Sequence, residues 1–208
     1  MPARIPPGTR YVYLIRHGMY DRVDSLDDRT ANGLNALGVE QARLLGERLR
    51  ALPVRPRLLV SSGLRRARET GDELGRILGL PCARDSLIEE CSPPSLADTA
   101  STKADRNEAE ACTATLERAW QRYMQPSPEG DAHDLVVCHG NVIRWFVGRA
   151  LQADPKRWIT MSIGNASLTI LAVRPDGSTR LVMYSDVGHL PVDEQTWTGT
   201  GPGWWPSK

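Results

Sequence analysis

The sequence predicts a single α/β domain with a mostly parallel central sheet and helices on both faces. Three observations lead to this fold class. Short apolar runs alternate along the chain with segments of helical periodicity. The first three runs lack the apolar–polar alternation of half-exposed strands, which is typical of strands buried on both faces. The length of 208 residues suits one α/β domain with a full core.

The elements follow in a strand–helix order that ends in a hairpin. Apolar runs predict strands over 11–15, 58–60, 135–138, 168–173 and 181–184. Apolar residues three or four positions apart predict helices over 35–52, 63–80, 105–125 and 141–152. The turn sequence R-P-D-G at 174–177 predicts that the last two strands pair as a hairpin. We expect an N-terminal extension over 1–10, one domain over 11–190 and a C-terminal tail over 191–208.

Composition and charge exclude several classes of function. A net charge of +1 gives no bulk attraction to nucleic acid or an anionic membrane. No apolar run approaches the ~20 residues of a membrane span, and the N-terminus lacks the apolar core of a signal peptide. Without a C-x-x-C pair, the cysteines are expected to be reduced thiols, in neither a disulfide framework nor a zinc site: Cys82, Cys91, Cys112 and Cys138. These features predict a cytoplasmic protein without nucleic-acid or membrane partners.

The three predicted parallel strands end next to arginines and histidines. The first strand runs into Arg16 and His17, the second leads to Arg66, and the third to His139. Because ligands bind at the carboxyl ends of parallel strands, we expect these four side chains to meet. Such a group would repel itself without an anion. A phosphoryl group fits best, since guanidinium groups offer planar, bidentate donors to its oxygens.

Two histidines among arginines indicate catalysis as well as binding. A neutral imidazole can accept a phosphoryl group and pass it to water. Guanidinium charge nearby lowers the pKa of a histidine and keeps it neutral at pH 7. The leaving oxygen needs a proton, for which the segment L-I-E-E-C at 87–91 offers Glu89 and Glu90. No cluster of His, Asp and Glu has the spacing of a zinc or magnesium site, so we expect chemistry without a metal.

These segments resemble the histidine phosphatase superfamily, which includes the cofactor-dependent phosphoglycerate mutases. The resemblance spans about residues 11–186. It is carried by R-H-G at 16–18, L-N-A-L-G-V-E-Q-A at 34–42, S-S-G-L-R-R-A-R-E-T at 61–70, L-I-E-E at 87–90, V-C-H-G-N-V-I-R at 137–144 and N-A-S-L-T-I-L at 165–171. It implies a phosphoglycerate-mutase-like fold and no cofactor.

The resemblance also implies roles for individual residues. His17 is the expected phosphorylated nucleophile, and Glu90 is the expected acid, although the adjacent Glu89 leaves the register open. The expected phosphate pocket consists of Arg16, Arg66, His139 and Asn141, with His139 also expected to take part in catalysis.

Within this family the resemblance is strongest to mitochondrial protein phosphatases that act on phosphoserine and phosphothreonine. It rests on Tyr20, D-R-T at 28–30, R-P-D-G at 174–177 and S-D-V-G-H-L-P at 185–191. The expected substrate is therefore a phosphoprotein or a small phosphate ester. The short segment between the acid and the second histidine favours hydrolysis over mutase chemistry, which needs a more closed pocket. Because the chain begins almost at the first strand, we do not expect the membrane anchor and assembly segment of those phosphatases.

Three alternatives remain open at this level. Cys138 and Arg144 have the C-x5-R spacing of cysteine-dependent phosphatases, although the loop between them holds one glycine and two β-branched residues. A phosphate-binding module without turnover would keep the same pocket. The tryptophans of the tail suit a cover over an apolar patch, a contact in a homodimer, or a tail without fixed structure: Trp197, Trp204 and Trp205.

Overall fold

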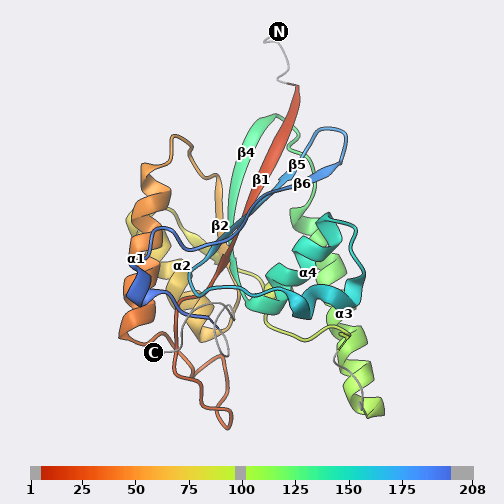
Figure 1. Cartoon of the computed structure of the whole chain (residues 1–208). Coiled ribbons are helices and arrows are strands. Elements are labelled where there is room, and N and C mark those ends of the chain that lie inside the picture. Colours follow the sequence, from red (N-terminus) through yellow and green to blue (C-terminus); the bar gives the residue numbers. More distant parts are fainter. Residues whose placement is uncertain (1–5, 97–101, 198–208) are drawn as a thin grey trace.

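The computed structural model describes residues 6–96 and 102–197, and these form one sheet with helices on both faces (Figure 1). The six strands lie in the order β3-β2-β4-β1-β5-β6. Their bounds are β1 Pro7–Arg16, β2 Leu58–Ser61, β3 Cys82–Arg84, β4 Gly130–Cys138, β5 Leu168–Val173 and β6 Thr179–Asp186. The predicted fold class is confirmed.

The sheet is parallel where the sequence predicts burial on both faces. β1 pairs in parallel with β4, and β2 pairs in parallel with both β3 and β4. β5 and β6 form the predicted hairpin and add two antiparallel strands beside β1. β1 is longer than predicted, because residues 7–10, expected as an extension, belong to it. β3 is a three-residue edge strand that the apolar pattern did not reveal.

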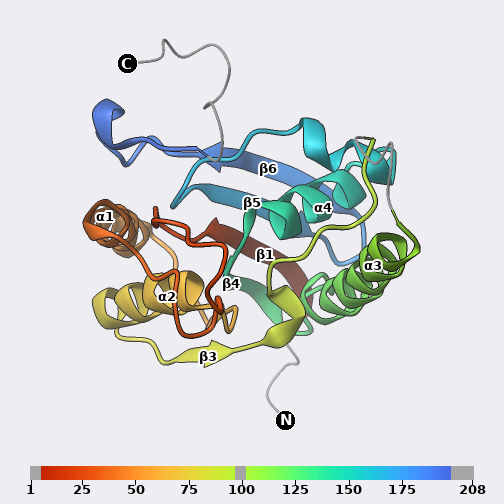
Figure 2. The ribbon, with the colours of Figure 1, turned by 90° about the horizontal axis from the view of Figure 1, so that it is seen from below.

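Two pairs of helices cover the sheet, one pair on each face (Figure 2). The helices are α1 Ala36–Ala51, α2 Arg65–Leu78, α3 Lys103–Tyr123 and α4 Gly140–Ala150, and the short 3-10 turns are η1 Ser86–Ile88, η2 Pro155–Thr160 and η3 Val192–Glu194. α1 and α2 lie on one face, and α3 and α4 on the other. Side-chain caps start two of them: Asn35 accepts from the Gly38 amide, and Thr102 forms a capping box with Asp105.

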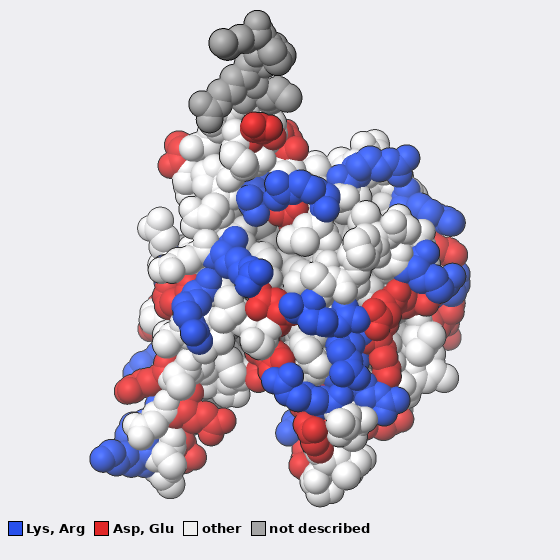
Figure 3. All heavy atoms as spheres, turned by 180° about the vertical axis from the view of Figure 1, so that it is seen from behind, with Lys and Arg blue, Asp and Glu red and all other residues white. Residues whose placement is uncertain are grey.

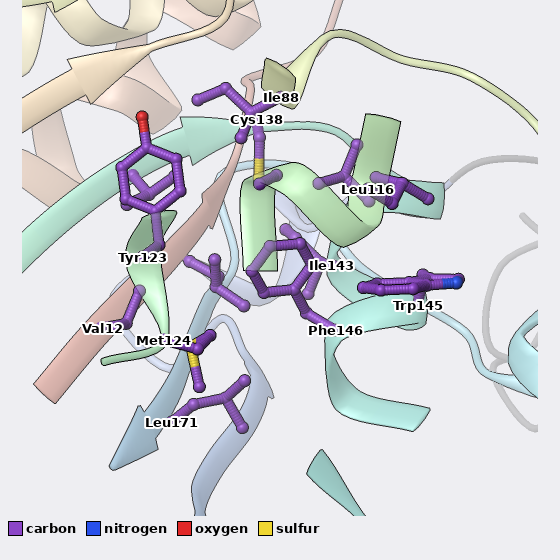
Figure 4. Close-up of a cluster of buried hydrophobic side chains, with 14 of the residues drawn as sticks. Val12, Ile88, Leu116, Tyr123, Met124, Cys138, Ile143, Trp145, Phe146 and Leu171 are labelled. Atoms are coloured by element: carbon purple, nitrogen blue, oxygen red, sulfur yellow. The ribbon is translucent and has the colours of Figure 1, made fainter. Parts of the chain in front are cut away.

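The period of two along β1 divides its side chains between two cores. Val12 and Leu14 face α3 and α4, whereas Tyr13 and Ile15 face α1 and α2. Figure 4 shows part of the first core, in which Phe146 is completely buried. Burial on both faces leaves only the strand ends open for polar chemistry.

One expectation about the cysteines is wrong. Cys91, in the loop after η1, and Cys112, on α3, form a disulfide bond, whereas Cys82 and Cys138 are free thiols. The sequence spacing gave no indication of this pair because it joins two separate elements that only the tertiary fold brings together.

Two further features bear on the predicted partners. No helix in the described part of the chain has the length and apolar character needed to cross a membrane. Trp197 forms an antiparallel bridge with Gly164, beside the carboxyl end of β1. Trp204 and Trp205 lie outside the described residues.

Candidate active site

The carboxyl ends of β1 and β4 bring the two predicted histidines together. Arg16 is paired with Cys138 in the parallel register, so the residues that follow, His17 and His139, are neighbours. Their ring centroids lie 5.1 Å apart. Arg66, on the first turn of α2, lies next to His17, and its Nε is 3.3 Å from Nε2 of His17.

His17 is held in one tautomer. Its Nδ1 lies 2.8 Å from the carbonyl oxygen of Gly18, and a carbonyl can only accept a hydrogen bond, so Nδ1 carries the proton. Nε2 is therefore the nitrogen with the lone pair, and it accepts from Nε of Arg66. The pKa of His17 is well below the ordinary value because the ring is buried and because His139, Arg16 and Arg66 add positive charge nearby. The geometry provides a neutral imidazole with a directed lone pair.

His139 is also buried and neutral. Its Nε2 lies 2.8 Å from Oγ of Ser62, and its Nδ1 has no hydrogen-bond partner in the described part of the chain. Burial, with Arg66 and Arg16 nearby, lowers its pKa well below the ordinary value. Ser62 was not among the site residues predicted from the sequence. The signal was available, because Ser62 directly follows β2 and obeys the same strand-end rule as the histidines.

The two predicted arginines are anchored on different elements. Nη1 of Arg16 donates to the carbonyl oxygen of Ile163 at 2.7 Å, and burial lowers the pKa of this guanidinium to about 10. Arg66 is 3% exposed and forms an ion pair with Asp28 at 2.9 Å. The ion pair with Asp28 and the contact with His17 hold the guanidinium of Arg66 at the carboxyl ends of the strands.

A half-buried tyrosine forms a wall of the site. The Tyr20 ring meets His17 edge-on at 5.2 Å between centroids, and the guanidinium of Arg66 lies 4.7 Å from the Tyr20 centroid. Neither Tyr20 nor Asp28 was predicted from the sequence to contact the phosphate site. Both lie in the loop between β1 and α1, whose path only the tertiary structure defines.

The two adjacent glutamates have different environments. Oε1 of Glu90 accepts from the backbone amide of Asn141 at 3.2 Å, and burial raises the pKa of this carboxyl to about 7, although Arg16 and Arg66 act in the opposite direction. Glu89 instead forms an ion pair with Arg29 at 2.7 Å. A carboxyl that keeps its proton near neutral pH can act as a general acid, which favours Glu90.

The side chain of Asn141 is turned toward the loop that follows Glu90. Its Nδ2 donates to the carbonyl oxygen of Cys91 at 3.1 Å and to Oγ of Ser92 at 3.3 Å. Its Oδ1 accepts from Arg144 at 3.2 Å. In this arrangement Asn141 fixes the position of the acid, and its predicted contact with phosphate stays a prediction.

The competing cysteine is a poor candidate nucleophile. Cys138 is completely buried, among the core side chains of Figure 4, and burial raises the pKa of its thiol. Arg144 bonds to Asn141 instead of lining a loop around Cys138. A reactive thiolate needs an exposed, electropositive environment, which this position lacks. Within residues 6–96 and 102–197, no three His, Cys, Asp or Glu side chains gather as metal ligands would.

Comparison with known families gives one match over most of the chain. The model of the histidine phosphatase superfamily (branch 1) matches residues 12–134 and 98–186. Among curated proteins, the mitochondrial serine/threonine-protein phosphatase Pgam5 of Caenorhabditis briggsae is 37% identical over 196 residues, which are 91% of this chain and 68% of that protein. The human protein of the same name is 37% identical over 198 residues, covering 90% of this chain and 66% of its own length.

Solved structures agree on the fold. Phosphoglycerate mutase from Plasmodium falciparum aligns with a TM-score of 0.62 and 25% identity, over 88% of this chain and 95% of that one. Mycobacterial glucosyl-3-phosphoglycerate phosphatase with inorganic phosphate aligns with a TM-score of 0.60 and 23% identity, over 88% of this chain and 100% of that one. The second likeness supports the fold alone.

The curated relatives correct one prediction. All of those named above are mitochondrial proteins by name, so the expected cytoplasmic location is wrong. That expectation came from composition and the absence of a signal peptide, and neither feature reports on organelles other than the secretory route.

Proposed function

This chain belongs to the histidine phosphatase superfamily and is a phosphatase, and we propose that it removes phosphate from phosphoserine and phosphothreonine in proteins by way of a phosphohistidine on His17. The observation that carries the mechanism is the hydrogen bond from Nε of Arg66 to Nε2 of His17. It joins the attacking atom to the residue best placed to hold the phosphoryl group.

In the first step, the phosphate of the substrate binds between the guanidinium groups of Arg16 and Arg66 and the ring of His139. Nε2 of His17 attacks phosphorus in line with the leaving oxygen, and the P–O bond to the substrate breaks as the P–N bond forms. The Nδ1 proton bound to the Gly18 carbonyl keeps the ring oriented during attack. The fixed cations stabilise the charge on the equatorial oxygens.

The leaving oxygen takes its proton from Glu90. The pKa of about 7 leaves a large share of this carboxyl protonated at neutral pH. Glu90 then accepts a proton from water as the water attacks the phosphohistidine. Phosphate is released and the neutral His17 and protonated Glu90 are restored.

The preference for a protein substrate rests on two supports. The curated relatives are named serine/threonine-protein phosphatases. In addition, Figure 3 shows the molecule hollowed between two projections, which in Figure 1 are the loop between β1 and α1 and the N-terminal part of α3. The loop exposes Val23 and Leu26, which suit contacts with a polypeptide.

A substrate panel tests this proposal. The kcat/KM for phosphate release should be higher for phosphoserine and phosphothreonine peptides than for small esters such as 3-phosphoglycerate. A higher kcat/KM for a small ester would indicate a metabolite phosphatase instead of a protein phosphatase. Movement of phosphate from one hydroxyl of the small ester to another would indicate a mutase. If the protein released no phosphate even from an aryl phosphate, the result would indicate a phosphate-binding module without catalytic activity.

A further inference from the structure

The disulfide between Cys91 and Cys112 lies directly beside the proposed acid, and we propose that it is a redox-modification site for dithiol reductants that controls the position of Glu90. This inference rests on the proposed function, because it concerns the protonation of the leaving group. Cys91 is the residue after Glu90, and Cys112 is on α3.

The segment that carries Glu90 contacts α3 both before and after this glutamate. Upstream, the hydroxyl of Tyr123 donates to Oδ2 of Asp85 at 2.5 Å, and Asp85 caps the turn η1 that leads to the glutamates. Downstream, the disulfide joins Cys91 to Cys112. Arg122 of α3 also forms an ion pair with Asp85 at 3.3 Å. Glu90 is therefore held between non-covalent contacts and a covalent bond to the same helix, and of these only the covalent bond responds to redox conditions.

The disulfide at Cys91 lies next to the hydrogen bonds that hold Glu90. The carbonyl oxygen of Cys91 accepts from the side chain of Asn141, whose backbone amide donates to Glu90. Asn141 also donates to Oγ of Ser92, and further along the loop Trp158 donates to the carbonyl of Pro94 and Leu96 donates to that of Lys156. Loss of the disulfide would leave the residues next to Glu90 with weaker, non-covalent restraints.

The two sulfurs differ in accessibility. Cys91 is half-buried, whereas Cys112 is 5% exposed within the core of α3 and α4. A thiolate of the reductant therefore attacks Sγ of Cys91, forming a mixed disulfide and releasing Cys112 as a thiolate, which takes up a proton. The second thiol of the reductant displaces Cys91, so the reductant becomes a disulfide and two electrons pass to the protein.

The experiment compares two substrates before and after reduction of the folded protein with dithiothreitol. A thiol count measures reduction, and circular dichroism checks the fold. A phosphoserine peptide needs protonation of its leaving group, whereas an aryl phosphate does not. We expect kcat for the peptide to fall about 10-fold or more, since misplacing a catalytic group costs this much, while kcat for the aryl phosphate changes little.

Variants separate this site from other thiols. The double variant Cys91→Ser/Cys112→Ser should behave like the reduced protein and no longer respond to dithiothreitol. Cys82→Ser, which removes a free thiol outside the site, should respond as the wild type does. The inference is overturned if the bond resists reduction in the folded protein, if both substrates keep their rates after two thiols appear, or if both rates fall equally. Inactivity of the oxidised protein toward the aryl phosphate would instead refute the proposed function.

Discussion

Nε of Arg66 lies 3.3 Å from Nε2 of His17, although the two residues are 49 positions apart in the sequence. The contact places a buried cation directly at the lone pair of the proposed nucleophile. The charge of Arg66 adds to the lowering of the pKa of His17, which burial causes first and to which His139 and Arg16 also contribute, while the carbonyl of Gly18 holds the proton on Nδ1 and leaves the lone pair on Nε2.

Arg66→Ala should lower kcat by about 10²-fold or more, because it removes a donor aimed at transition-state charge. Arg65→Ala is the matched control. Its side chain forms an ion pair with Glu69 on the surface of α2, and its rate should stay close to that of the wild type. Steady-state kinetics of aryl phosphate hydrolysis measure both. Equal losses at the two positions would contradict the assigned register.

Glu90→Gln should slow the phosphoserine peptide far more than an aryl phosphate, because only the poor leaving group needs a proton. Glu89→Gln is the control, since Glu89 is engaged in an ion pair with Arg29. The ratio of kcat values for the two substrates measures the effect. A selective loss at Glu89 would move the acid by one residue.

The pH profile of the wild type should follow the same carboxyl. A general acid works only when protonated, so kcat/KM for the peptide should fall as pH rises above about 7, the pKa of Glu90. On the acid side of the profile, the His17 ring must be neutral to attack phosphorus. Because its pKa is lowered, the fall in kcat/KM at low pH should begin below the ordinary pKa of a histidine. A plateau that extends well above pH 8 for the peptide would count against Glu90.

His17→Ala should lose nearly all activity and keep its fold, whereas Cys138→Ala should retain most of its activity with a small packing cost. Labelled phosphate trapped without acid should appear on the peptide that contains His17. Acid should then remove it, because a phosphoramidate hydrolyses in acid and survives base. Label on the Cys138 peptide would overturn the mechanism.

Asp28→Asn should strengthen inhibition by inorganic phosphate. The substitution removes a negative charge 2.9 Å from Arg66 and leaves more uncompensated positive charge for the anion. We expect Ki to fall about 3-fold to 10-fold, since Asp28 is 40% exposed and solvent screens part of the effect. Asp24→Asn, whose carboxylate pairs with Arg22 in the same loop, should leave Ki unchanged. Weaker inhibition in Asp28→Asn would contradict this account.

Activity should persist after EDTA treatment and dialysis, because arginine side chains supply the positive charge that metal ions provide in other phosphatases. The rate of aryl phosphate hydrolysis measures this directly. Loss of activity that a divalent ion restores would contradict the mechanism.

The sequence by itself determined five of the six strands, because burial on both faces demands apolar runs and antiparallel pairing of β5 and β6 follows from a short turn, whereas the edge strand β3 carries no such run. It also predicted that Arg16, His17, Arg66 and His139 would gather, since the carboxyl ends of parallel strands meet at one edge. These inferences depend on local pattern and on a general rule of sheet topology.

Only the tertiary structure decided the rest. Neighbouring glutamates look alike in the sequence. They differ in the folded chain because desolvation raises the pKa of Glu90, whereas Glu89 forms an ion pair with Arg29. The tautomer of His17 depends on the carbonyl of Gly18, and the disulfide depends on the packing of a loop against α3. Desolvation, hydrogen-bond direction and covalent pairing depend on distances between segments that are far apart in the sequence. Those distances exist only in the folded chain.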